Sequence, residues 1–390
     1  MLIVDSMRAD MPWNGYPRDI APNLTALAAK SVNYTRAYAL SSYTAMSIGG
    51  FLGGRYPGEL RRNGSFFSRY PTEETFFPET LQAENVTTVA AHAHFYFDEA
   101  KTGFRQGFDI YEMVPGIIKD AKTDNSITSP AHVDLAMNTL TQGAERGAAR
   151  GAPFFAYFHF MDPHDKYRKH EGFRSFGPKN RDRYDGEIFF TDHHLGRLLE
   201  FIAAAPWANE TAIIVSADHG EAFGEKGMTR HGFELWDHLV HVPLLVHYPG
   251  LTPQRIDALR SHLDLTPTVF DLLGVAPPDY VRGISRLPEI RGDVAPEPGE
   301  VIVDLPRTNY NWRRRALIKG RYKLIAFGDD FRYELYDIVD DPTEQVDLRL
   351  RERDVMKRMK ARYLELVATI DDICPSRTDN LKGKRPGAKC

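Results

Sequence analysis

Hydrophobic residues gather in four short, almost uninterrupted runs along the first part of the chain. The runs cover residues 2–4, 154–160, 212–216 and 242–247. Runs that lack polar alternation are typical of strands buried on both faces, as in a parallel sheet. We therefore predict that these four segments are strands of one mostly parallel sheet.

Helical patterns fall between these runs. A first helix is predicted at residues 21–28, and a second at residues 191–205, where leucines recur at helical spacing. A third is predicted at residues 263–273, which open with Asp264 and Pro267 as start signals. The alternation of strands and helices predicts an α/β fold in which helices flank the sheet.

The pattern changes after residue 285. Residues 286–299 are rich in proline, glycine and charge, which predicts a linker. Four alternating runs then predict a small antiparallel sheet, at residues 301–303, 316–318, 322–325 and 333–336. An amphipathic helix is predicted at residues 349–370. The predicted organisation is a main domain (1–285), a linker (286–299), a C-terminal α+β subdomain (300–375) and a loose basic tail (376–390).

Acids and histidines follow the predicted strands where the strands end. Asp5 comes after the first run, and Asp218 and His219 come after the third. Ligands of open α/β sheets sit at the carboxyl ends of the strands. These three side chains can share one divalent cation, and mixed oxygen and nitrogen ligands suit zinc or manganese better than calcium. Each residue alone would more simply cap a turn or pack in a loop, but three together favour a metal site.

Residues 41–50 combine serine, threonine and glycine in a way that suits the N-terminus of a helix, where backbone N–H groups hold an anion. A hydroxyl in this segment could be a nucleophile if a metal lowered its pKa. A plain N-capping role is the alternative, and the residues alone do not choose between the hydroxyl groups.

Histidines are unusually dense among the remaining polar residues. Together with the nearby acid Asp162, these histidines are His159, His164, His231, His238 and His241. An imidazole can ligate a metal, bind an anionic oxygen or protonate a leaving group. Packed or surface roles are equally reasonable for His159, His238 and His241.

Composition narrows the functional classes. The chain has 390 residues, of which 42% are hydrophobic and 26% charged, which is globular and excludes a fibrous or disordered chain. A net charge of -4 gives no support for a nucleic-acid or membrane-surface binder. The two cysteines exclude a disulfide framework and a cysteine-based zinc site. No apolar run of roughly 18 residues is present, so no membrane span is predicted. The absence of a leader predicts a cytoplasmic protein, unless the N-terminus is trimmed.

Several short motifs resemble those of the sulfatase family, within the alkaline phosphatase superfamily. They are residues 2–10 (LIVDSMRAD), Gly53–Pro57, Asp162–His164, Ser216–Glu221, Tyr322–Leu324 and Asp341–Glu344. The resemblance covers nearly the whole chain. It implies an alkaline-phosphatase-like sheet flanked by helices, with a small C-terminal antiparallel sheet and a helix.

The chain departs from the family pattern at the nucleophile. Formylglycine sulfatases carry C/S-x-P-x-R, whereas Thr44 stands at the first position here, followed by Met46 and Ile48 in place of the proline and arginine. This segment is similar to that of phosphoethanolamine transferases, which use an unmodified threonine. In addition, Ser6 replaces the second aspartate of the usual pair, and His231 replaces a lysine twelve residues after the histidine of the Asp-His motif.

The resemblance implies a set of site residues. The implied metal ligands are Asp5, Thr44, Asp218 and His219, as in phosphonate monoester hydrolases. The implied catalytic residues are Thr44, His231 and His164, and the implied substrate contacts are His164, His231, Lys226 and Arg230. One divalent cation is expected, with Zn²⁺ favoured over Mn²⁺ or Ca²⁺, and a second Zn²⁺ could bind through His164 and His231.

The leading functional hypothesis is a metal-dependent hydrolase or transferase of phosphoesters or phosphonates, including phosphodiesters, that acts through a phosphothreonine intermediate. The alternative is a sulfuric ester hydrolase that lacks formylglycine. An inactive binding protein is a third possibility, which the intact ligand set disfavours. The expected partner is a small-molecule anionic ester. Residues 66–67, 95–97 and 166–183 are candidate pocket loops.

Overall fold

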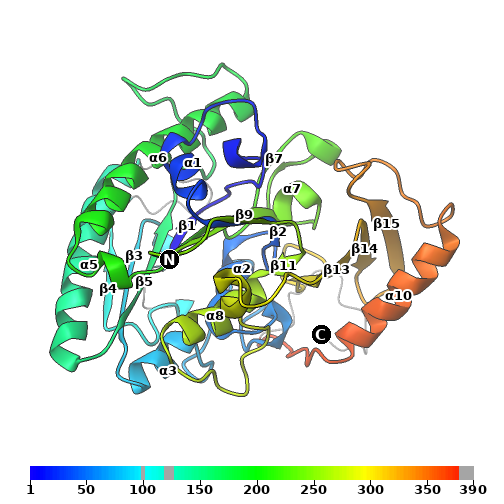
Figure 1. The fold of residues 1–390 in the computed structure, drawn as a ribbon. Helices are drawn as coiled ribbons and strands as arrows, with labels where there is room; N and C mark the ends of the chain where they lie inside the picture. The colour runs from blue at the N-terminus through cyan, green and yellow to red at the C-terminus, as the bar shows by residue number, and fades with distance from the viewer. Residues whose placement is uncertain (98–101, 118–126, 377–390) are drawn as a thin grey trace.

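The computed structural model describes residues 1–97, 102–117 and 127–376 of the chain. Its centre is a nine-stranded sheet in the order β10-β2-β9-β6-β1-β5-β3-β4, with β11 also paired to β2 (Figure 1). The strands are β1 (Leu2–Val4), β2 (Val32–Tyr38), β3 (Thr87–His92), β4 (Ile110–Met113), β5 (Phe154–Phe160), β6 (Ile213–Ser216), β9 (His241–His247), β10 (Gln254–Ile256) and β11 (Arg260–Ser261).

All four hydrophobic runs are strands of this sheet, as predicted. β1 lies in the middle and pairs in parallel with both β5 and β6. β9, however, runs antiparallel to β6 and to β2, so the sheet is mostly rather than wholly parallel. A hydrophobic run reports burial on both faces and carries no information on strand direction. Consequently the residues that follow β9 lie at the opposite end of the strands from those that follow β1 and β6.

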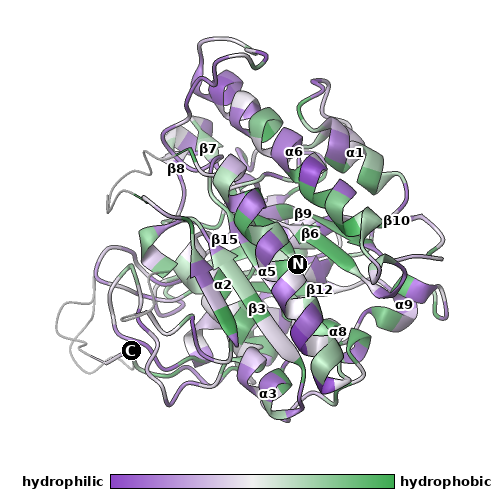
Figure 2. Cartoon of the chain, turned by 90° about the vertical axis from the view of Figure 1, so that its left-hand side faces the viewer, coloured by the Kyte–Doolittle hydropathy of each residue, from purple (hydrophilic) through white to green (hydrophobic). Residues whose placement is uncertain are grey.

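Helices cover both faces of the sheet (Figure 1). One face is covered by α1 (Pro22–Ala28), α5 (Ser129–Arg150) and α6 (Asn180–Ala204). The other is covered by α2 (Thr44–Gly53), α3 (Phe77–Ala83) and α8 (Leu265–Leu272). Hydrophilic and hydrophobic positions alternate along α5 and α6, as surface helices require (Figure 2). Among the described residues no helix is long and apolar enough to cross a membrane.

The largest differences from the predicted elements are at α6 and in the predicted linker. The helix predicted at residues 191–205 begins earlier, at Asn180. The hydrophobic pattern does not predict its first turns, because their residues are polar and show no hydrophobic stripe. The predicted linker contains the short helix α9 (Leu287–Arg291), whose Leu287 and Ile290 are buried.

The C-terminal part forms a second, antiparallel sheet, as predicted. Its strands are β12 (Glu300–Leu305), β13 (Arg314–Lys319), β14 (Tyr322–Phe327) and β15 (Arg332–Asp337), and α10 (Arg353–Val367) packs on it. Ser376 bridges to Asn63, and the rest of the predicted tail, residues 377–390, lies outside the described residues. The division at residues 285 and 300 into two domains stays a prediction.

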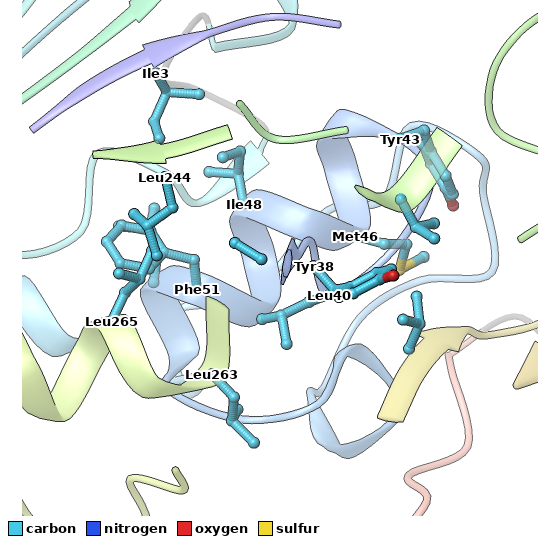
Figure 3. Close-up of a cluster of buried hydrophobic side chains, with 14 of the residues drawn as sticks. Ile3, Tyr38, Leu40, Tyr43, Met46, Ile48, Phe51, Leu244, Leu263 and Leu265 are labelled. Atoms are coloured by element: carbon cyan, nitrogen blue, oxygen red, sulfur yellow. The ribbon is translucent and has the colours of Figure 1, made fainter. Parts of the chain in front are cut away.

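Helix α2 is held rigidly, which matters because Thr44 is its first residue. Every other residue of the helix is buried, and Ile48 and Phe51 pack among Leu244 and Leu265 (Figure 3). Gly49 is required by close contact, because a Cβ there would lie 2.0 Å from the hydroxyl of Tyr70. The start of α2 is therefore fixed relative to the strand ends beside it.

Candidate active site

Asp5 is the first residue after β1 and is fully buried. The following residue, Ser6, adopts a φ of 59°, a left-handed conformation that is strained for a serine. This bend lets the Ser6 hydroxyl donate to Oδ1 of Asp5 at 2.7 Å, and the Ser6 backbone N–H donate to Oδ1 of Asp218 at 3.3 Å. The strained turn thus orients both carboxylates.

Asp218 and His219 follow β6, the neighbour of β1. The Nδ1–H of His219 donates to the backbone oxygen of Gly220 at 2.9 Å, which leaves the Nε2 lone pair free to bind a cation. A glycine is needed at position 220, because a Cβ there would lie 2.2 Å from the backbone oxygen of His238. The Asp-His-Gly motif therefore combines two possible ligands with a close backbone contact.

The hydroxyl of Thr44 faces this cluster. Its Oγ1 lies 3.2 Å from Oδ2 of Asp5 and 3.2 Å from Nε2 of His219. The N-cap position of α2 is Tyr43, so the Thr44 side chain does not cap the helix. Its place at the helix N-terminus adds the positive end of the helix dipole, which favours developing negative charge.

His159 joins the cluster from β5, where it pairs in register with Ile3. Its Nε2 lies 3.1 Å from Oδ2 of Asp5 and 3.8 Å from Oδ2 of Asp218, and its Nδ1 lies 3.0 Å from the hydroxyl of Tyr157. The side chain is completely buried. Among the described residues, Asp5, His159 and Asp218 form a group whose ligand atoms are close enough to share one metal ion.

The charges of the cluster fit a divalent cation. Among the described residues, buried Oδ2 of Asp218 has no hydrogen-bond partner. Burial together with the charge of Asp5 raises the pKa of Asp218 to about 7. Burial would also raise the pKa of Asp5, but the hydrogen bond from His159 and the charges of His164 and His219 hold it well below its usual value. Carboxylate oxygens and imidazole nitrogens in this arrangement are suitable metal ligands.

His231 and Glu221 form a second charged pair beside the cluster. Nδ1 of His231 lies 3.3 Å from a carboxylate oxygen of Glu221, and its ring centroid lies 4.2 Å from that of His219 and 5.2 Å from that of His164. Burial would lower the pKa of His231, but the Glu221 charge outweighs burial and raises it to about 9. His231 is therefore a protonated group that can donate through Nε2.

A pocket of about 320 Å³ opens onto this edge of the sheet, and Thr44, His164 and His231 line it. Most of the remaining wall is aromatic: Tyr43, Phe66, Phe67, Tyr96, Phe97, Phe233 and Tyr310. The rings of Tyr43 and Phe66 stack at 4.2 Å. Two of the predicted pocket loops, residues 66–67 and 95–97, thus reach the pocket, and Tyr310 comes from the C-terminal part of the chain.

Some predicted residues lie elsewhere. The ammonium of Lys226 contacts the backbone oxygen of Glu344 and lies 4.3 Å from the ring of Trp236, so it does not line the pocket. Arg230 does line the pocket, but its guanidinium pairs with Asp165 at 2.8 Å.

Two further members of the dense polar set have structural partners. Asp162 accepts backbone N–H bonds from Thr128 and Ser129 at the start of α5. His241 hydrogen-bonds Asp237 and the backbone oxygen of Thr35.

Two residues at the site, Glu221 and His94, are not among the candidate residues of the sequence analysis, whereas His159 is among them with packing as an equal alternative. His94 lines the pocket two residues after β3, and its ring centroid lies 6.0 Å from that of His164. β3 has the sequence TTVAAH, and its polar residues interrupt the hydrophobic pattern. The pattern therefore does not predict this buried strand, and His94 is not predicted as a residue near a strand end. His159 lies within a hydrophobic run, and the pattern does not distinguish a packed histidine from a metal ligand at such a position.

Comparisons with known proteins agree with this geometry. Residues 1–275 match the family described as Sulfatase, and residues 224–369 match the family described as N-sulphoglucosamine sulphohydrolase, C-terminal. The chain is 23% identical to choline-sulfatase of Rhizobium meliloti (strain 1021), over 89% of this chain and 81% of that protein. It is 26% identical to ulvan-active sulfatase of Formosa agariphila, over 72% of this chain and only 62% of that protein.

A solved structure extends the comparison of folds. The phosphonate monoester hydrolase of Agrobacterium radiobacter superimposes with a TM-score of 0.75 at 17% identity, and the match covers 94% of each chain. Fold and site together define an alkaline-phosphatase-like ester hydrolase. Within that class, the chain belongs to the sulfatase family, because the family match covers well over half of it. Enzymes of this family bind a divalent metal, for which the strand-end cluster is the candidate site.

Proposed function

We propose that this enzyme hydrolyses a sulfuric ester, with the unmodified hydroxyl of Thr44 as the nucleophile and one divalent cation as cofactor. The observation that carries the proposal is the position of Thr44 Oγ1, at 3.2 Å from both Asp5 and His219. Membership of the sulfatase family and the sulfatase names of the relatives support the choice of a sulfuric ester.

The proposed ligands of the cation are Asp5, Thr44, Asp218 and His219, with His159 at the same centre. When bound, a divalent cation supplies positive charge that polarises the ester and stabilises the Thr44 alkoxide, whose proton is lost to solvent. Zn²⁺ is favoured because the donor set mixes histidine with carboxylates, and Mn²⁺ is the next choice.

His231 is the proposed general acid, and His164 is the proposed second contact to the anionic group. Thr44 Oγ forms a bond to sulfur while the bond between sulfur and the ester oxygen breaks. Protonated His231 gives its proton to the departing oxygen. Water then attacks the sulfur of the sulfated Thr44 while neutral His231 accepts one proton of that water. The bond between sulfur and Thr44 Oγ breaks, its electron pair stays on Oγ and restores the Thr44 alkoxide, and hydrogen sulfate leaves.

Cleavage of phosphoesters or phosphonates is the second candidate. It is favoured by Thr44 itself, because Met46 and Ile48 remove the pattern for formylglycine formation, and by the fold shared with a phosphonate monoester hydrolase. The same residues would then form a phosphothreonine, and an acceptor alcohol in place of water would make the enzyme a transferase.

A panel of four nitrophenyl substrates separates the candidates: the sulfate, the phosphate, a phosphodiester and a phosphonate monoester. Each is assayed with the full chain after addition of Zn²⁺ or Mn²⁺, and kcat/KM is compared. The highest value is expected for the sulfate. A value for the phosphonate or phosphodiester that exceeds it tenfold or more would establish the second candidate.

A further inference from the structure

The segment of residues 166–183, called here the basic loop, has a charge opposite to that of the rest of the chain. It leads from the active-site pocket into α6 and can be followed at the top of Figure 1. Seven of its residues are Lys or Arg and two, Glu171 and Asp182, are acidic, a balance of +5 (7 − 2) in a chain of net charge -4. The proposed catalytic residues do not include any of this segment.

The basic loop encloses a cavity of about 540 Å³ against the first turns of α6. Its lining includes Lys169, Arg174, Arg183, Phe173 and Phe176. Within the described part of the chain, no carboxylate forms an ion pair with any of these three cations. The acid that does line the cavity, Asp182, is already neutralised by Arg18 at 2.7 Å. Among the described residues, the lining of the cavity therefore carries more positive than negative charge.

Buried contacts hold the basic loop in shape. Nε2 of His170 lies 2.5 Å from a carboxylate oxygen of Glu187, and the His170 ring stacks on Phe190 at 3.6 Å. The backbone N–H of Arg168 donates to the other oxygen of Glu187. At the far end, the backbone N–H of Lys179 donates to Asp182. Because both ends are anchored, the cavity exists before a ligand binds, which lowers the entropic cost of binding.

Tyr167 lies between the cavity and the active site. Asp165 lines the active-site pocket, and Tyr167, two residues later, lines the cavity. Burial and the neighbouring carboxylate of Glu221 raise the pKa of the Tyr167 hydroxyl, and Glu221 is the partner of His231. A ligand that occupies both spaces would have to extend across Tyr167.

We propose that this cavity is a second anion-binding site, which holds further sulfate or carboxylate groups of a carbohydrate chain whose ester is cleaved at Thr44. Guanidinium groups bind such planar or tetrahedral anions through paired hydrogen bonds. The Arg174 guanidinium lies 4.8 Å from the centre of the Phe176 ring, so a cation and an aromatic surface stand side by side. That combination suits a sugar ring, with its apolar C–H face, that carries an anion. The inference rests on the proposed function only in naming the ester that is cleaved at Thr44; binding of the anion does not depend on it.

Binding of fluorescein-labelled dextran sulfate to the full chain, followed by fluorescence anisotropy, tests the proposal without turnover. The test variant is Arg174→Glu/Arg183→Glu, in which both residues are exposed. The matched control is Lys357→Glu/Arg358→Glu on the exposed face of α10, which changes the net charge equally. The affinity of the test variant should fall at least about tenfold, because like charges replace complementary ones, and that of the control less than about twofold.

Turnover of nitrophenyl sulfate separates this proposal from the proposed function. Its kcat/KM should be equal in the wild type and in the test variant, since a small ester does not reach the basic loop. If the wild type cleaves no nitrophenyl ester, the proposed function fails while the binding result still decides the anion site. Equal losses of affinity in both variants, no binding of dextran sulfate, or equally tight binding of a single-stranded oligonucleotide would each overturn the carbohydrate site.

Discussion

Two of the buried charge clusters in this molecule are balanced in opposite ways. At the strand ends, Asp5 and Asp218 are buried among histidines, and within the described residues no lysine or arginine pairs with either carboxylate. Below the C-terminal sheet, Lys323 is equally buried, but its ammonium lies 2.9 Å from Glu344 and 3.7 Å from Asp237.

The difference in charge balance distinguishes the candidate metal site from a structural cluster. The lysine cluster contains its own cation and joins β14 to α7 (Asp237–Val240), so it connects the C-terminal sheet to the segment that leads into β9. The strand-end cluster has two acids and no permanent cation, which is costly in a dry interior unless a cation is supplied from outside. The lysine cluster is neutralised within the chain, whereas the strand-end cluster has negative charge that the proposed cation would balance.

Asp218→Asn should have the largest effect of the four substitutions, because it removes a carboxylate from the candidate metal site. Activity is expected to fall to background and metal content to fall with it, because the substitution removes one of the two carboxylate charges. The free energy of unfolding of the metal-free protein should stay the same or rise, because Oδ2 of Asp218 has no hydrogen-bond partner to lose. Elemental analysis, kinetics and urea unfolding measure the three quantities, and a large loss of stability would contradict the comparison.

Lys323→Met should have the opposite effect. Removing the cation leaves Asp237 and Glu344 buried and unpaired, so the free energy of unfolding should fall by about 3–5 kcal/mol. The kcat per folded molecule should change little. The control is Lys319→Met on the neighbouring strand, where the side chain is 51% exposed and pairs with Glu300, and it should cost less than about 1 kcal/mol. Equal costs at the two positions would show that the buried cluster is not structural.

His159→Phe tests the histidine that joins the functional cluster from β5. Metal affinity, measured by competition with a chromogenic chelator, should fall about 10–100-fold, which is typical when a group that ligates or orients a ligand is lost. The control is His132→Phe, because His132 is equally buried but hydrogen-bonds the backbone oxygen of Ala91. Both variants should lose stability, and only the first should lose metal affinity; equal affinities would place His159 outside the site.

Asp237→Asn gives the smallest expected effect, seen in the pH dependence of stability. Burial would raise the pKa of Asp237, but the Lys323 charge outweighs it and holds the pKa below its usual value. The folded state thus binds fewer protons than the unfolded state, and the stabilisation is lost as pH falls below about 4. Asp237→Asn should flatten this fall by up to about 1.4 kcal/mol per pH unit in urea titrations. A slope in Asp237→Asn equal to that of the wild type would show that Asp237 does not cause the loss of stability.

The sequence predicted those parts of the site that follow recognisable strands. Asp5, Asp218 and His219 come after hydrophobic runs, and the structure brings them together because β1 and β6 are parallel neighbours. His94 and His159 could not be placed in the same way, since β3 is partly polar and His159 lies inside its strand. The hydrophobic pattern also does not predict strand direction, as the antiparallel β9 shows.

Lys226 illustrates a different limit of sequence reasoning. It is close in sequence to His231, but the turn between β7 (Ala222–Phe223) and β8 (Thr229–Arg230) carries it away from the pocket. Its ammonium packs instead near Trp236 and Tyr336, at 4.3 and 5.1 Å from the ring centres. Proximity in sequence predicts proximity in space only within one regular element.

The central claim is that Thr44 is the nucleophile, and rapid acid quenching during turnover tests it most directly. The full chain is mixed with the best nitrophenyl ester, quenched, digested and analysed by peptide mass spectrometry, with Thr44→Ala and Thr44→Ser as companions. A sulfuryl or phosphoryl adduct on Thr44 is expected, with no turnover in Thr44→Ala and measurable turnover in Thr44→Ser. Full activity in Thr44→Ala, or an adduct on Ser42 or Ser47 instead, would contradict the account.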